Sequence, residues 1–379
     1  MDTPPGQVPG APMTSSEAAD LWMSRNEQSD TSEYVSHYRS SVSRKVLFIL
    51  VCVILAFLSV GASIGLGAYD IGILNSYSIL WSHITGAGST GLDDYIVWES
   101  RLPRTLVGIL SGAGLAVGGC VMQIILRNPL ADTYTTGISA GAGFGATLAI
   151  TAGIVLVDNA YPVVFNAFVF ALIPMLVIMM FSMLKGGTHI VMIMSGIAMM
   201  FFFNAISAIF KMVANPNDLS ALYAWEVGSL AGTGWEGAAA IFATVSAAIF
   251  VLLVLSRRID LLGSGDDYAR SMGVNVSMLR NASLLVVTLM VSVVVCFTGL
   301  IGFVGLVAPH VCRLFVGSEA RFLIPASASF GAMLLVLADT VGRLVIPPAE
   351  IQVGIITAFL GAPLFLYLVM RSRRAAWRR

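Results

Sequence analysis

Apolar runs about as long as a lipid bilayer is thick recur throughout the chain after residue 44, and they constrain the fold more than any other feature. A helix needs about 20 apolar residues, with a range of roughly 17–25, to cross a membrane. On that criterion we predict ten spanning helices, at 45–66, 104–125, 137–157, 162–184, 190–213, 237–256, 281–301, 304–316, 323–343 and 351–370. The eighth is too short to cross alone, so we expect a broken or buried segment at Gly302–Gly305. The predicted fold is an all-α membrane protein.

The overall composition indicates the same class. Of the 379 residues, 57% are hydrophobic and only 11% are charged, whereas a soluble chain carries about 25% charged residues. The net charge is zero, which excludes a bulk basic surface for nucleic acid. The four cysteines lie in apolar runs without the spacing of metal ligands, so we expect neither a metal site nor a disulfide.

Both ends of the chain are polar and are predicted to be cytoplasmic. Residues 1–44 form a tail rich in Ser, Pro, Glu and Asp that we expect to be disordered, and 372–379 form a short basic tail. An even number of spans places both ends on one side. With ten spans, 17 of the 21 Lys and Arg residues fall on that side, which is the bias that marks the cytoplasmic face.

Glycines spaced four residues apart mark two of the spans. Such spacing lets helix backbones approach closely in a membrane, so we expect the spans at 104–125 and 137–157 to be central in the bundle. The glycines are Gly108, Gly112, Gly114, Gly118, Gly137, Gly141 and Gly145.

Several kinds of chemistry are absent from the sequence. No GxxxxGK[ST] loop is present, which excludes ATP chemistry in this chain, and no protease motif occurs in the spans, so we expect no catalytic residues. Asp339 is the one clear carboxylate inside a span. It lies four residues before Arg343, a spacing that favours a structural ion pair, with a proton site as the alternative.

The loop at 257–280 interrupts the spans on the predicted cytoplasmic side with a short amphipathic unit between basic residues. A transporter that lacks an energy source and carries such a unit is expected to use a separate motor protein. The sequence therefore indicates the permease subunit of an ATP-binding-cassette (ABC) transporter.

Four stretches resemble, in order, the signature regions of FecCD-type permeases, which are the membrane subunits of importers for ferric siderophores, haem and vitamin B12. They are RLPRTLVGILSGAGLAVGGCVMQIILRNPLADTYTTGISAGAGFGA (101–146), GLIGFVGLVAPHVCRLFVG (299–317), LLVLADTVGRL (334–344) and VGIITAFLGAPLFLYLVMR (353–371). The resemblance covers 45–371. It implies a ten-helix type II importer permease that pairs with a second permease chain (a copy or a paralogue), two ATPase subunits and an extracytoplasmic binding protein.

The resemblance also implies roles for individual residues. Arg101, Arg104 and Arg343 match outward-facing arginines that receive acidic residues of the binding protein; the alternative is that they reach toward lipid head groups. Within the cytoplasmic loop, a pair of coupling helices would sit in a cleft of the ATPase, with an ordinary solvated loop as the alternative. The coupling residues are Gly265, Asp266, Ala269, Arg270 and Gly273. Gly265 and Gly273 would allow tight turns, and Ala269 a close approach.

A turn between the fourth and fifth predicted spans matches the region of the cytoplasmic gate. Gly187 would supply a hinge there, next to Thr188 and His189. Met192 would contact the cargo, with a role as apolar filler as the alternative.

We therefore expect a multi-pass permease of the bacterial inner membrane that imports a ferric siderophore, with ATP and Mg²⁺ bound by the partner ATPase and no cofactor in this chain. Haem or vitamin B12 import by the same architecture is the first alternative. A proton-coupled secondary transporter that uses Asp339 is the second, and a structural membrane scaffold is the third.

Overall fold

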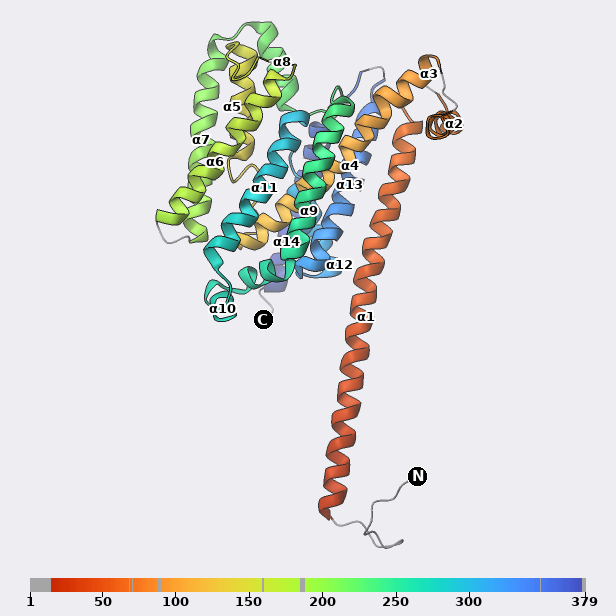
Figure 1. The fold of residues 1–379 in the computed structure, drawn as a ribbon, viewed down its shortest axis with the longest axis vertical. Coiled ribbons are helices and arrows are strands. Elements are labelled where there is room, and N and C mark those ends of the chain that lie inside the picture. The colour runs from red at the N-terminus through yellow and green to blue at the C-terminus, as the bar shows by residue number, and fades with distance from the viewer. Residues whose placement is uncertain are drawn as a thin grey trace. The chain divides into compact units, whose positions relative to one another are not determined.

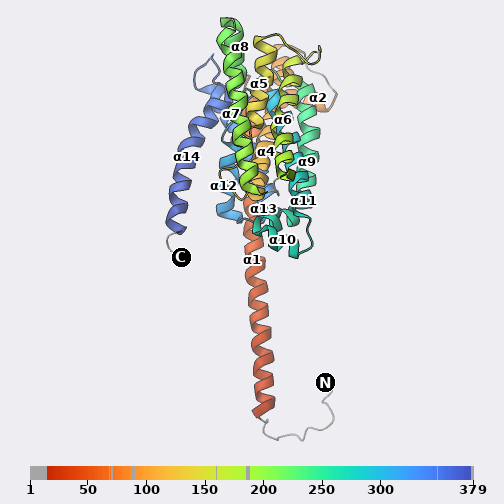
Figure 2. The same cartoon turned by 90° about the vertical axis from the view of Figure 1, so that its left-hand side faces the viewer.

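The computed structural model describes residues 15–67, 69, 71–86, 90–158, 160–184, 188–347 and 349–376. These residues are almost entirely helical, and the β structure among them is one isolated bridge, Ile346 to Ala349. Figure 1 and Figure 2 show the helices. They are α1 (Ser15–Gly65), α2 (Ile73–Ile84), α3 (Leu92–Tyr95), the π-helix η1 (Ile96–Arg101), α4 (Leu102–Ile125), α5 (Ile138–Thr151), α6 (Pro162–Leu184), α7 (His189–Val213), α8 (Pro216–Glu226), α9 (Gly234–Ser264), α10 (Asp266–Ser271), α11 (Val276–Thr298), α12 (Val304–Val316), α13 (Ala320–Leu344) and α14 (Val353–Ala376).

Seven helical segments of the described chain are long and apolar enough to cross a membrane. They are Ser40–Gly65, Leu92–Ile125, Pro162–Met183, His189–Val213, Gly234–Ser264, Val276–Thr298 and Ala320–Leu344. Three further apolar helices are shorter: Ile138–Thr151, Val304–Val316 and Val353–Tyr367. Each of the ten predicted spans overlaps one of these helices, but seven have the length of a full crossing.

The residues before Phe48 and those from Phe48 onward belong to separate units, and the helical bundle is formed within the second. The sequence predicted a disordered tail at 1–44, whereas the backbone is helical from Ser15. The physical reason is that neither Gly nor Pro occurs between Ser15 and Gly61, so no residue interrupts the helix that starts before the apolar run. Residues 1–14 of the predicted tail, and 377–379 of the basic tail, lie outside the described residues.

The two long outer connections contain helices of their own. The connection at 67–100, for which the sequence predicted no elements, carries α2, α3 and η1, so that helix runs continuously from Leu92 into α4. The second connection, between α7 and α9, carries α8. Both groups lie at the end of the bundle opposite α10 (Figure 1), as the predicted sidedness requires.

Helix α4 lies at the centre of the bundle, in contact with α9, α11, α12 and α13. In its apolar segment 83% of the residues are buried. A Cβ on Gly112 would lie 2.3 Å from the carbonyl oxygen of Gly331 in α13, and one on Gly119 would lie 1.9 Å from that of Gly305. The predicted central position is therefore confirmed for the span at 104–125, whereas the second glycine-rich span, α5, packs mainly against α6 and α7.

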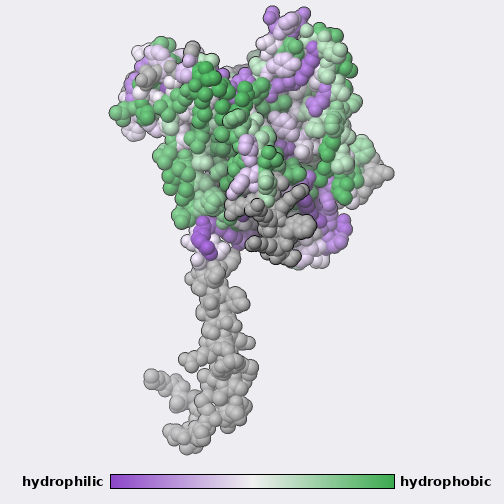
Figure 3. Space-filling model, turned by 180° about the vertical axis from the view of Figure 1, so that it is seen from behind, coloured by the Kyte–Doolittle hydropathy of each residue, from purple (hydrophilic) through white to green (hydrophobic). Residues whose placement is uncertain are grey.

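Several other spans expose apolar side chains outward. In α7 only 22% of the apolar segment is buried, and in α9 only 28%. Figure 3 shows hydrophobic residues over the sides of the helical bundle and hydrophilic residues gathered toward its two ends. This distribution is that of a protein whose solvent along the sides is lipid.

The chain is broken between α11 and α12, close to the predicted position. Residues 299–303 are not helical, and Phe303 has a φ of 66°. The break packs against the end of α8, where a Cβ on Gly299 would lie 2.1 Å from the carbonyl oxygen of Trp225, and the first turn of α12 packs against α4 at Gly119. This backbone is therefore surrounded by protein rather than lipid.

Candidate functional site

At the outer end of the bundle, one buried carboxylate lies between two guanidinium groups. Arg104 donates from Nε and Nη2 to Asp339 at 2.9–3.2 Å, and Nε of Arg343 lies 3.1 Å from the other side of that carboxylate. Arg104 also donates from Nη1 to Glu350 at 2.7 Å. The predicted pairing of Asp339 with Arg343 is present, and Arg104 is the larger contributor of hydrogen bonds.

Arg101 and Arg343 point into the protein and bind backbone carbonyls at the end of α1. Arg101 donates to the carbonyls of Ile64 at 2.9 Å and of Tyr69. Arg343 donates to the carbonyl and to Oγ of Ser63, at 3.1 and 2.7 Å. The last carbonyls of a helix have no partner within it and favour cations. With 6% and 4% of their surfaces exposed, these two arginines have a structural role inside the chain.

Arg104 differs from the other two because its partner Glu350 is exposed. The Glu350 side chain is 41% accessible and lies in the connection between α13 and α14. Of the three arginines predicted to dock a binding protein, Arg104 is therefore the one joined to the molecular surface by an exchangeable ion pair. Sequence reasoning missed Glu350, since no spacing links residue 104 to residue 350.

The loop that the sequence places on the cytoplasmic side folds into one short helix, α10, rather than the predicted helix pair. The physical reason is that α9 continues past Arg257 and Arg258 to Ser264 before the chain turns. Gly265 and Gly273 flank α10 with φ values of 142° and 78°, conformations that favour glycine, as predicted. The exposed Arg270 makes a loose pair with Asp267 at 3.4 Å.

The residues of α10 divide into an inward and an outward set. Ala269 is fully buried in the core of this chain, so it does not face a partner as the resemblance implied. Asp266 binds Arg127 and Arg280 from the same chain. The outward set consists of Asp267, Tyr268, Arg270, Met272 and, on the following turn, Met278. An exposed group of large apolar side chains with charges beside them is typical of a protein-binding surface.

The predicted gate residues have local structural roles. Gly187 lies outside the described residues. Oγ1 of Thr188 accepts a hydrogen bond from the backbone N–H of Val191 at 3.4 Å, which makes Thr188 the N-cap of α7. His189 is half-buried, and Met192, 1% exposed, packs in the main core. For Met192 the filler alternative is the one that the packing supports.

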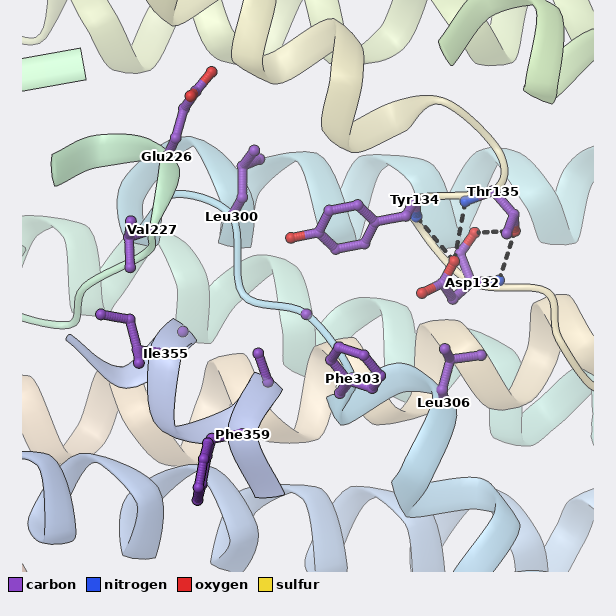
Figure 4. Close-up of a pocket in the computed structure, with 13 residues that line it drawn as sticks. Asp132, Tyr134, Thr135, Glu226, Val227, Leu300, Phe303, Leu306, Ile355 and Phe359 are labelled. Atoms are coloured by element: carbon purple, nitrogen blue, oxygen red, sulfur yellow. Dashed lines mark hydrogen bonds between the residues drawn. The ribbon is translucent and has the colours of Figure 1, made fainter. Parts of the chain in front are cut away.

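A cavity of about 760 Å³ opens between the connection at 126–137, the break before α12 and the start of α14 (Figure 4). Its lining is mostly apolar, with Phe303 and Phe359 contributing rings and Tyr134 reaching toward the centre. Asp132 accepts hydrogen bonds from the N–H groups of Tyr134 and Thr135, at 3.1 and 3.0 Å, and thereby fixes this connection. No pattern in the sequence indicates this cavity, because four segments that are distant along the chain form it, the end of α8 being the fourth.

These features define a multi-pass helical membrane protein with a buried polar cluster at one end of the bundle, a short exposed helix at the other end and a mostly apolar cavity. Sequence comparison identifies the family. Residues 48–371 match the FecCD transport family, and the chain belongs to that family. The matched region agrees with the 45–371 predicted from the signature stretches.

Curated relatives match nearly end to end. One relative is YfmE of Bacillus subtilis, a permease protein of an Fe(3+)-citrate import system. It is 37% identical to this chain, and the match covers 87% of this chain and 97% of YfmE. The cobalamin import permease of Halobacterium salinarum is 36% identical over 82% of this chain and 84% of its own. Among solved structures, a transporter described as metal-chelate type, in an inward-facing conformation, matches with a TM-score of 0.75 and 29% identity over 85% of this chain and 98% of its own.

Proposed function

We propose that this chain is the permease subunit of an ABC importer that moves a ferric siderophore across the cytoplasmic membrane of a bacterium. The family and the iron-chelate relatives support this substrate class. The cobalamin relative supports vitamin B12 as an alternative cargo of the same architecture. Haem is a further alternative. In the proposed complex two permease chains pair, two ATPase subunits bind ATP and Mg²⁺, and a binding protein delivers the cargo. Ten crossings with both termini cytoplasmic complete the proposed topology.

The observation that carries this proposal is the outward face of α10. It presents Tyr268 and Met272, each more than half exposed, beside the charges of Asp267 and Arg270. The sequence has no nucleotide-binding loop, so if ATP drives transport its energy has to enter through a contact with another protein. The short helix at the predicted cytoplasmic end provides the surface for that contact.

At the opposite end, we propose that the binding protein docks around Arg104. A carboxylate of that protein would replace Glu350 on Nη1 of Arg104, while Asp339 continues to hold the rest of the guanidinium. Arginine favours such an exchange because its planar fork binds two carboxylates in fixed directions. Arg101 and Arg343 support the docking surface from below by fixing the end of α1.

The proton-coupled alternative depends on Asp339, and the packing argues against it. The residue is 2% exposed, and its carboxylate is hydrogen-bonded by Arg104 and paired with Arg343. A proton site needs a carboxylate that exchanges protons with a water-filled path. Asp339 instead has the surroundings of a structural ion pair.

The proposal is tested by transport in proteoliposomes that contain this permease and the ATPase encoded beside it, with and without the cognate binding protein. Ferric citrate, a ferric hydroxamate and cobalamin are offered separately. We expect uptake of the iron chelate that requires both ATP and the binding protein. Uptake driven by a proton gradient in the absence of the ATPase would overturn the proposal.

A further inference from the structure

A network of ion pairs separate from the one around Asp339 attaches α10 to the helical bundle. We propose that Asp266, held between Arg127 and Arg280, is a positioning residue that passes movement of α10 to α4 and α11. This inference rests on the proposed function, because it assumes that a partner pushes on α10.

The three residues come from three different elements. Asp266 is the first residue of α10, Arg127 follows the end of α4, and Arg280 lies in the first turns of α11. Nη2 of Arg280 donates to both carboxylate oxygens of Asp266, at 2.7 and 2.8 Å, and Nη2 of Arg127 donates to Oδ1 at 2.5 Å. One carboxylate therefore joins α10 to two spanning helices.

Arg127 extends this junction to a third span. Its Nε and Nη2 donate to the carbonyl of Leu262, at 2.9 and 2.8 Å, near the end of α9. Its own backbone has a φ of 47°, a left-handed conformation that is uncommon for a residue with a side chain. A strained backbone persists where the surroundings fix it, and here the surroundings are the contacts to Leu262 and Asp266.

The charge balance makes Asp266 difficult to replace. The Arg280 side chain is only 2% exposed, whereas those of Arg127 and Asp266 are about a quarter exposed. Loss of the carboxylate would leave a buried guanidinium without its anion, which is costly. Burial opposes the charge on Asp266, but the hydrogen bonds and charges of Arg280, together with the charge of Arg127, outweigh it and lower the pKa of this group.

A glycine in an unusual backbone conformation lies at each end of the helix that this cluster holds. Gly265 and Gly273 bound α10 with backbone conformations that favour glycine, and no atom lies within 4 Å of a Cβ built at Gly273. Between these glycines, Asp266 and the buried Ala269 attach α10 to the bundle. Ala269 makes only apolar packing contacts, which have no preferred direction, whereas the hydrogen-bonded ion pairs of Asp266 are directional. A force on the outward face is thus passed through Asp266 to α4, the central helix.

The test compares Asp266→Asn with Glu319→Gln in the complete complex in proteoliposomes. Glu319 forms an ion pair with Arg321 at the start of α13, away from the outward face of α10, and both side chains are more exposed than that of Asp266, which makes Glu319→Gln a control for the loss of one surface carboxylate. ATPase binding, ATP hydrolysis and uptake are measured on the same preparations, and the readout is cargo molecules taken up per ATP hydrolysed. We expect Asp266→Asn to retain ATPase binding and to lose about three- to tenfold in this ratio, and Glu319→Gln to match the parent.

A second variant covers the case in which Asp266→Asn does not fold. Arg127→Gln removes the more exposed cation of the cluster and is expected to lower the same ratio. If either folded variant kept the parental ratio while only its thermal stability fell, the cluster would be merely structural and the inference would be wrong. The parent complex tests the proposed function separately. If the parent shows no ATP-driven uptake, both proposals are wrong. If the parent and the variants take up the same amount of cargo per ATP hydrolysed, only the role given to Asp266 is wrong.

Discussion

At the scale of single residues, the outer polar cluster shows what spacing along a helix can and cannot indicate. The i, i+4 spacing of Asp339 and Arg343 predicted their ion pair, because residues four apart share a helix face. It could not indicate Arg104, which is 235 positions away along the chain. For the same reason the two structural arginines were assigned to the surface: sequence shows the position of a residue near a helix end but not the direction of its side chain.

Removal of the central carboxylate should destabilise the fold. In Asp339→Asn, Arg104 and Arg343 would lose a shared buried anion, and breaking a buried pair in this way costs about 3–5 kcal/mol. Denaturant titration in detergent micelles, monitored by tryptophan fluorescence, would measure this loss. The exposed Asp267→Asn variant should stay within about 0.5 kcal/mol of the parent. A stable Asp339→Asn protein that had lost only proton-driven uptake would instead support the proton carrier.

Glu350 should limit the affinity for the binding protein. Because Glu350→Gln releases Nη1 of Arg104 from an exposed ion pair worth about 0.2–1 kcal/mol, we expect the binding protein to dock about two- to fivefold more tightly. Surface plasmon resonance with the permease in nanodiscs would measure the Kd. Glu319→Gln is the control, because its pair with Arg321 is similarly exposed at the other end of α13. Unchanged or weaker docking would refute the role given to Arg104.

The acid sensitivity of the Asp266 cluster follows from its lowered pKa. A depressed native pKa contributes stability that is present above the unfolded value, about 3.9 for Asp, and is lost as the pH falls through the native value. The difference in thermal stability between the parent and Asp266→Asn should therefore be constant from about pH 8 to 5 and shrink below about pH 4. Melting curves across that range would measure it. A difference that shrank near pH 6 would contradict the assignment.

At the scale of elements, the sequence located the apolar helices well and their ends poorly. Length and hydrophobicity of a run predict that a helix exists. They do not show that α9 continues beyond the membrane through Arg257 and Arg258, or that η1 joins Leu92 to α4. The single helix α10, and the cavity near Tyr134, depend on how the connections turn in space, which the residue pattern along one element does not contain.

Two glycines in α5 offer a matched test of close helix packing. A Cβ at Gly145 would lie 2.4 Å from the carbonyl oxygen of Asn166 in α6, whereas a Cβ at Gly143 would have no neighbour closer than 3.8 Å. Gly145→Ala should therefore cost about 1–3 kcal/mol through overpacking. Gly143→Ala should be neutral or slightly stabilising, because alanine favours helix. Thermal unfolding of both variants in the same detergent compares them directly, and equal stability would show that α5 and α6 separate freely.

At the scale of the whole molecule, sidedness is the property that depends on the short helices. Three helices, α11, α12 and α13, separate the exposed Asp267 from Glu350. If all three cross, these residues lie on opposite sides of the membrane. If the 13-residue α12 does not cross, they lie on the same side. One pair of positions therefore decides whether α12 crosses, which the ten-span topology requires.

Cysteine labelling can measure this sidedness. The four native cysteines are buried, so Asp267→Cys and Glu350→Cys would each introduce a reactive thiol at an accessible position. In sealed right-side-out vesicles, a membrane-impermeant maleimide should label Glu350→Cys at once and Asp267→Cys only after the membrane is opened. Equal labelling of both in sealed vesicles would exclude ten crossings.

The arginines at the end of α1 also have a consequence for biosynthesis. Ser63 is translated 280 residues before Arg343, whose guanidinium binds its carbonyl and hydroxyl groups. Unpaired carbonyls in or near lipid are costly. While most of the chain is still being synthesised, the end of α1 therefore lacks the guanidinium that pairs with its carbonyl groups in the finished protein. Arrival of α13 closes that end. We expect a chain that stalls before α13 to keep this helix end unpaired and to be degraded faster than the finished chain.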